Sequence, residues 1–117
     1  MIKLVKQNKQ NIIFNVEGKL QIDDYAVLTP TIDKAIKEYG YVNLMLVDKG
    51  FKGETARAIG KDMKFGFNSY SGVKKLAVVS DKEWIRMAVN MMSPFTKTEE
   101  KIFGLDEQDE ARSWLES

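Results

Sequence analysis

Two short apolar runs constrain this chain most, because each is typical of a buried strand and the first of a strand that is buried on both faces. They are Tyr41–Val47, which is apolar apart from Asn43, and Leu76–Val79. Strands of this kind occur in parallel sheets that are covered by helices. The second run leads through Ser80 and Asp81, a helix-entry signal, into a largely apolar helix. The sequence therefore predicts an α/β fold.

The N-terminal third of the chain predicts a hairpin and one helix. Residues 2–5 and 11–16 alternate apolar and polar side chains, which predicts a hairpin whose buried face includes Ile2 and Leu4 and whose second strand ends at Gly18. A helix follows, with Asp23 as its N-cap and Gly40 as its C-cap. Pro30 should interrupt this helix, unless Thr29 and Pro30 begin a second one.

Strands then alternate with helices to the C-terminus. Strand 41–47 precedes a loop at 48–53, a helix at about 54–70, strand 73–79, a helix at about 81–92, a brief strand at 101–103 and a last helix that Asp106 caps. The order β-β-α-β-α-β-α-β-α predicts one domain over residues 1–117. We expect a mostly parallel sheet with an N-terminal antiparallel hairpin, flanked by about four helices.

Composition argues against an enzyme. The chain has no Cys and no His, which removes thiol nucleophiles, thiolate and imidazole metal ligands, and the commonest general base. The adjacent acids Asp23-Asp24 and Glu99-Glu100 should point in different directions. Lys49–Gly53 holds two glycines near a helix start but lacks the ending of a phosphate-binding loop. We expect no catalytic residue, no metal and no cofactor.

Charge and hydropathy limit where the protein is expected in the cell and what it is expected to bind. No apolar run approaches the roughly 20 residues that span a bilayer, and the N-terminus lacks the apolar core of a signal peptide, so we expect a cytoplasmic protein. Residues 99–117 hold 2 basic and 7 acidic groups, a net charge of −5, and leave +6 on residues 1–98. A mildly basic body is compatible with a peripheral position at the inner membrane face. The dispersed Lys residues argue against nucleic acid.

Several segments resemble one bacterial family. They are Leu76–Ile85, Lys101–Phe103 followed by Asp109–Leu115, and the Asp24-Tyr25 helix start with Pro30 a few residues on. In these segments and in its order of elements, the chain resembles the SpoIIAA-like proteins, which are distantly similar to the STAS domains of anti-sigma-factor antagonists and anion transporters. The resemblance implies a sheet flanked by helices, no enzymatic activity, and association with membranes or apolar ligands through the two middle helices.

The resemblance departs from the STAS antagonists at one position. Those proteins carry a phosphorylatable Ser within an Asp-Ser pattern, at the start of the helix after the central strand. Here the corresponding segment, Asp48–Thr55, contains no Ser, and Thr55 is its nearest hydroxyl. We interpret Thr55 as a helix cap or first-turn residue, so a sigma-factor switch is not predicted.

The helix after Asp81 has more apolar surface than one packing face requires. A surface helix needs an apolar stripe of about 100°, whereas the apolar residues from Trp84 to Met92 span roughly 200° at 3.6 residues per turn. Burial on two sides, against the sheet and a neighbouring helix, is one explanation. The others are a ligand cavity, a membrane surface or a dimer partner.

Phe65 adds to this surface because it falls on the polar side of the helix at 54–70. There it is flanked by Lys61 and Lys64, as an interfacial anchor would be. Our first hypothesis is a binding domain that reversibly associates with an apolar ligand or membrane surface. The alternative is a protein-interaction module of STAS type that uses a partner or a homodimer. The predicted apolar contacts are Met63, Phe65, Phe67, Trp84, Met87, Met91, Met92 and Phe95, and the predicted basic surface is Arg57, Lys61 and Lys64.

Overall fold

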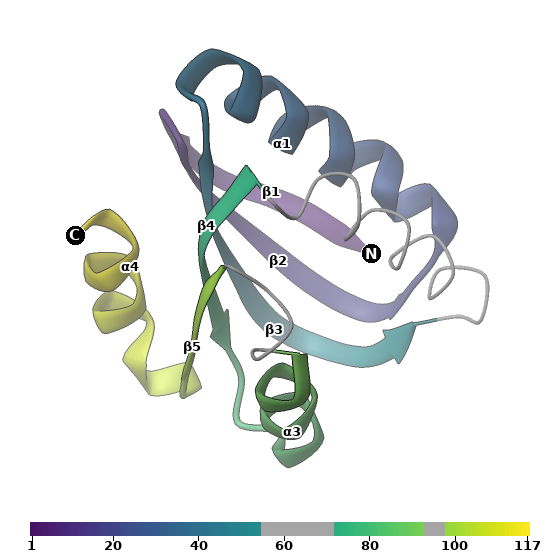
Figure 1. The fold of residues 1–117 in the computed structure, drawn as a ribbon. Helices are drawn as coiled ribbons and strands as arrows, with labels where there is room; N and C mark the ends of the chain where they lie inside the picture. Colours follow the sequence, from purple (N-terminus) through teal and green to yellow (C-terminus); the bar gives the residue numbers. More distant parts are fainter. Residues whose placement is uncertain (55–71, 93–97) are drawn as a thin grey trace.

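A single five-stranded sheet organises the chain (Figure 1). The computed structural model describes residues 1–54, 72–92 and 98–117. The strands lie in sequential order: β1 (Ile2–Asn8), β2 (Asn11–Leu20), β3 (Val42–Glu54), β4 (Val73–Val79) and β5 (Glu99–Phe103). β1 pairs antiparallel with β2, and the other three pairings are parallel. The predicted parallel sheet with an N-terminal hairpin is confirmed.

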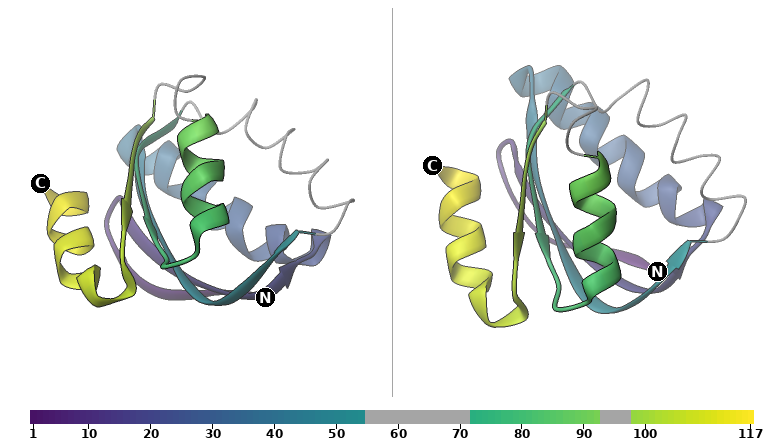
Figure 2. Two further views of the ribbon diagram at one scale, coloured as in Figure 1. Left: turned by 90° about the horizontal axis from the view of Figure 1, so that it is seen from below. Right: turned by 60° about the horizontal axis from the view of Figure 1, so that its bottom comes forward.

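Helices cover both faces of the sheet (Figure 2). α1 (Tyr25–Tyr39) and α3 (Glu83–Met92) lie on one face, and α4 (Gln108–Glu116) lies on the other. α1 connects β2 to β3, and α3 connects β4 to β5. Right-handed crossovers between parallel strands in sequential order place such helices on the same face. α4 follows the last strand and is not part of a crossover, so it can lie on the opposite face.

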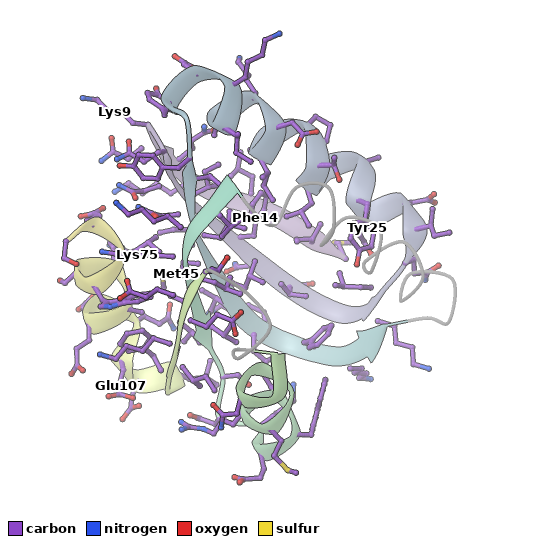
Figure 3. The ribbon with its side chains drawn as sticks, viewed as in Figure 1. Lys9, Phe14, Tyr25, Met45, Lys75 and Glu107 are labelled. Carbon is purple, nitrogen blue, oxygen red and sulfur yellow. The ribbon has the colours of Figure 1, made fainter. Side chains whose placement is uncertain are left out.

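Each face of the sheet has its own apolar core because strand side chains alternate. Phe14 points towards α1, whereas Met45 points towards α4 (Figure 3). The core under α1 contains Ile2, Ile12, Phe14, Val16, Ile32, Ala35, Val42, Leu44, Val73 and Leu76. The core under α4 contains Ile13, Met45, Val47, Ala77, Val79, Phe103, Ala111 and Leu115. β3 and β4 are therefore both buried on two faces, which confirms the prediction made for residues 41–47.

Pro30 lies inside α1, and the predicted interruption is wrong. Ala26 and Pro30 are both exposed, so the carbonyl that loses its helical N–H partner lies on the solvent side. The predicted N-cap is also wrong. A 3₁₀ turn (η1, Ile22–Asp24) precedes the helix, and the carboxylate of Asp24 accepts the N–H of Gln21 at 2.8 Å. Gly40 ends α1 with a φ of 84°, which confirms the predicted C-cap.

β2 and β3 both continue past the residues that were predicted to end them. Gly18 lies within β2, and the predicted loop at residues 48–53 belongs to β3. Gly18 pairs with Phe51, and the pairing register shifts on both sides of Gly18. The backbone there has a φ of 59°, so the glycine forms a bulge and does not terminate the strand. This extension of β3 carries residues of the candidate site.

The hairpin is confirmed, but its predicted buried face is only partly correct. Ile2 is buried, whereas Leu4 is exposed. The register of β1 against β2 shifts between Leu4 and Lys6, which marks a bulge near the outer edge of the sheet. β1 is an edge strand, so its side chains beyond Ile2 are exposed.

The C-terminal segment differs from the prediction in its cap. β5 begins at Glu99, and a 3₁₀ turn (η4, Leu105–Glu107) leads into α4. Glu107, rather than the predicted Asp106, accepts the N–H of Gly104 at 2.8 Å. As predicted, α4 packs inward through Ala111, Trp114 and Leu115.

Candidate functional site

A buried carboxylate joins β3, at the point where its pairing with β4 stops, to the residues that follow the carboxyl end of β4. We call Asp48, Ser80 and Lys82 the carboxyl-end network. Asp48 Oδ1 accepts the backbone N–H groups of Gly50 (2.9 Å) and Phe51 (2.7 Å), and Oδ2 accepts the hydroxyl of Ser80 (2.8 Å). Lys82 Nζ lies 2.9 Å from both carboxylate oxygens. Asp48 and Ser80 meet because β3 and β4 are parallel and each residue directly follows the last pair between them, Val47 and Val79.

The network keeps Asp48 ionised although its side chain is only 6% exposed. Burial by itself raises the pKa of this carboxyl group. Hydrogen bonds from Lys82, the backbone of Phe51, Ser80 and the backbone of Gly50 outweigh the burial and lower the pKa from 3.8 to about 2. A carboxylate with four separate donors is a structural anchor, since its oxygens are already engaged by the protein.

Lys82 extends the network into the start of α3. Its ammonium also donates to the carbonyl of Phe51 at 2.7 Å, and its N–H donates to Ser80 Oγ at 3.1 Å. Its own carbonyl accepts the N–H of Arg86 at 3.3 Å, inside the first turn of α3. Two residues after Lys82, the Trp84 ring lies 5.5 Å from the Phe51 ring between centroids. β3 and α3 are therefore joined by charge, by backbone and by aromatic contact.

α3 presents an apolar surface beside this network. We call Trp84 and Met87 the exposed α3 face, because they are 47% and 59% exposed. Ile85, between them in sequence, is 7% exposed and packs inward. The explanation that this helix buries its apolar arc on two sides is therefore wrong for Trp84 and Met87. On the same side of the sheet, partly buried apolar residues border the core under α1: Leu20, Leu28, Ile36, Leu46, Phe51 and Val78.

Of the predicted apolar contact residues, Trp84 and Met87 are the two whose side chains the structure describes. Met91 and Met92 belong to α3, but their side chains are not described. Met63, Phe65, Phe67 and Phe95, and the predicted basic residues Arg57, Lys61 and Lys64, lie outside the described residues, as does Thr55. The predicted helix at 54–70 lies there too, except for Glu54, which ends β3.

The prediction from sequence missed the carboxyl-end network. Asp48 was interpreted as a loop residue, and Ser80 with Asp81 as a helix-entry signal. A usable signal was present, because Asp48 directly follows the apolar run 41–47 and Ser80 directly follows the apolar run 76–79. Residues that follow corresponding positions of adjacent parallel strands lie at the same edge of the paired region, so these two polar residues could be expected to lie close together. Asp81 instead accepts the N–H of Leu105 at 3.1 Å.

Within residues 1–54, 72–92 and 98–117, no group of three or more acidic residues is arranged to hold a metal ion. No helix in the same part of the chain combines the length and the apolar character needed to cross a membrane.

The sequential five-stranded sheet, its antiparallel first strand and its two helical layers define an α/β fold of the SpoIIAA-like class. The family model described as SpoIIAA-like matches residues 11–116. The chain belongs to the SpoIIAA-like family. A comparison with curated proteins finds no significant match.

Two solved structures share this fold over nearly the whole chain. One is the crystal structure of an uncharacterised protein with a SpoIIAA-like fold from Shewanella loihica, with 25% sequence identity and a TM-score of 0.80, covering 97% of this chain and 93% of that one. The other is the anti-sigma factor antagonist SpoIIAA in its unphosphorylated form, with 9% identity and a TM-score of 0.66, covering 100% and 99%. The second likeness concerns the fold alone.

Proposed function

We propose that this protein is a non-enzymatic binding domain that associates reversibly with an apolar ligand or a membrane surface. The observation that carries the proposal is the exposed α3 face, because Trp84 and Met87 project from a helix whose Ile85 already packs inward. Partly buried Leu46, Phe51 and Val78 line the same side of the sheet. Exposed apolar side chains that are grouped on one element mark binding sites more often than isolated ones do.

The size of this surface favours a weak interaction. Burying a Trp or Met side chain completely contributes roughly 2 kcal/mol, and half of each side chain is already covered. The two residues together therefore supply about 2 kcal/mol before the cost of association. Exposed Asp81 and Glu83 precede Trp84, while half-buried Lys82 and Arg86 carry the opposite charge, so this segment offers no net attraction to an anionic surface. Attachment should be reversible and should depend on apolar contact.

Co-sedimentation with vesicles tests the membrane form. The Trp84→Gln/Met87→Gln variant should lose most of the pelleting that the wild-type chain shows with phosphatidylcholine vesicles. Val27→Gln is the matched control, because Val27 is 45% exposed on α1 and is also an apolar residue on a helix surface. Equal pelleting of all three proteins, or pelleting of none, would contradict the membrane form. A fluorescent fatty acid, titrated into the same three proteins, tests the apolar-ligand form.

The family supports a second candidate, a regulatory module that binds a protein partner or a second copy of itself. One solved neighbour with this fold is an anti-sigma factor antagonist, and the exposed α3 face would serve a protein partner as well as a lipid. Light scattering after size-exclusion chromatography separates the two candidates. A stable dimer that Trp84→Gln/Met87→Gln dissociates would favour this second function.

A further inference from the structure

The start of α3 is tied to β3 by contacts that the structure describes in full. Among the α3 side chains that the structure describes, Ile85 alone is buried. The helix start is fixed by Lys82, whose ammonium reaches three acceptors: both carboxylate oxygens of Asp48 and the carbonyl of Phe51. These three contacts tie the first turn of α3 directly to β3.

The same contact determines the surroundings of Trp84. Lys82 holds the Phe51 carbonyl from one side, while Asp48 holds the Phe51 N–H from the other. The backbone of Phe51 is thereby held in position, and its ring lies against the Trp84 ring with 33° between the ring planes. If Lys82 released Asp48 and Phe51, the first turn of α3 and the ring contact would lose their common anchor.

We propose that Lys82 is a positioning residue, which fixes the start of α3 on the second half of β3 and so limits how far Trp84 and Met87 are presented to a ligand or membrane. The positioning role stands on the contacts of Lys82 alone. Its consequence for binding rests on the proposed function. The contact therefore regulates the exposed α3 face, and a change that breaks it should release apolar surface.

The chain offers a matched control on the opposite face of the sheet. Lys75 also reaches three acceptors, which are the carbonyls of Trp114 and Ser117 and the Ser117 hydroxyl. It fastens α4 as Lys82 fastens α3, and Figure 3 shows it on the side of α4. Lys75→Met and Lys82→Met thus remove the same charge and the same number of hydrogen bonds, but only the second touches the surroundings of Trp84.

Acrylamide quenching of Trp84 fluorescence tests the positioning role without any ligand. The sequence contains two tryptophans. The experiment therefore uses the full chain with Trp114→Phe, which leaves Trp84 as the only tryptophan. Because Trp84 is 47% exposed, its complete release in Lys82→Met should raise the quenching constant up to about twofold. Lys82→Arg, which keeps the charge, should stay near the parent value, and Lys75→Met should leave it unchanged. An unchanged constant in Lys82→Met, or an equal rise in Lys75→Met, would overturn the proposal.

Binding to phosphatidylcholine vesicles tests the consequence. Such vesicles carry no net charge, so the lost ammonium does not itself alter binding. Lys82→Met should pellet more than the parent and more than Lys75→Met, and equal pelleting would refute the regulatory role. Failure of every variant to pellet would count against the membrane function, while the quenching result would still decide the positioning role.

Discussion

The carboxylate of Asp48 and the ammonium of Lys82 lie 2.9 Å apart, although 34 residues separate them in the sequence. Asp48 is nearly buried and Lys82 is 36% exposed. Desolvation of a carboxylate is costly, and a single ion pair seldom repays it. Here the hydrogen bonds from Ser80 and from the backbone of β3 supply the rest of the stabilisation that offsets this desolvation.

Asp48 should make the protein sensitive to acid. Its pKa in the folded protein is about 2, below the 3.8 of the unfolded chain, so the unfolded state takes up the proton first. The stabilisation is therefore complete above about pH 5 and is lost as the pH falls through 4 towards 2, and it amounts to about 2 kcal/mol. Urea unfolding at a series of pH values should show this loss. Asp48→Asn should flatten the curve, whereas Asp33→Asn, at an exposed position on α1, should leave its shape unchanged.

Asn43 should hold the last turn of α4 against the sheet. It is 5% exposed, and its Nδ2 donates to the carbonyl of Leu115 at 3.3 Å and to Asn11 Oδ1 at 2.9 Å. Asn43→Ala should lower the free energy of unfolding by about 1–3 kcal/mol, since it leaves buried acceptors without a donor. Asn43→Asp should cost more, because it buries a negative charge beside the C-terminal end of a helix. Guanidinium denaturation measures both, with Asn8→Ala at the exposed hairpin as control. A loss no larger than that of the control would contradict this role.

Gly72 should be intolerant of a side chain because α1 lies against it. A Cβ at this position would be 2.5 Å from Cδ1 and 2.9 Å from Cγ1 of Ile36. Gly72→Ala should therefore destabilise the protein by about 1–3 kcal/mol, as overpacking does. Ile36→Ala removes the obstructing atoms, so the double variant should be more stable than the sum of the single changes predicts, by about 1 kcal/mol. Chemical denaturation of the four proteins provides this cycle, and strict additivity would refute the steric explanation.

Hydrophobic patterning predicted the strands well because burial on two faces leaves a clear mark on sequence. The runs at 41–47 and 73–79 are strands in which Met45 and Ala77 pack towards α4, while their neighbours pack towards α1. The end of β3 was not predictable in the same way. Gly50 and Gly53 are residues of a type common in turns, and their φ angles are 98° and 104°. They nevertheless lie within a strand, which pairs irregularly with β2.

The candidate site was predicted only on α3. The wide apolar arc pointed to Trp84 and Met87, because an excess of apolar surface is visible along a single helix. The contact of Asp48 with Lys82 depends on the register between β3 and β4 and on a turn after β4. Periodicity carries no information about either of these, so only the placement of polar residues after two buried strands gave a hint.

Lys9 is the one described residue other than glycine with a positive φ, at 56°. It lies in the two-residue turn between Asn8 and Asn11, which pair across the hairpin. The left-handed conformation costs a residue with a Cβ about 1–2 kcal/mol, while glycine avoids this cost and loses part of the gain to its greater freedom in the unfolded chain. Lys9→Gly should therefore raise the free energy of unfolding by up to about 1 kcal/mol. Urea unfolding of Lys9→Gly beside Gln10→Gly checks this, because Gln10 has no positive φ and its replacement should destabilise the hairpin. A loss of stability in both variants would show that the turn gains nothing from glycine at position 9.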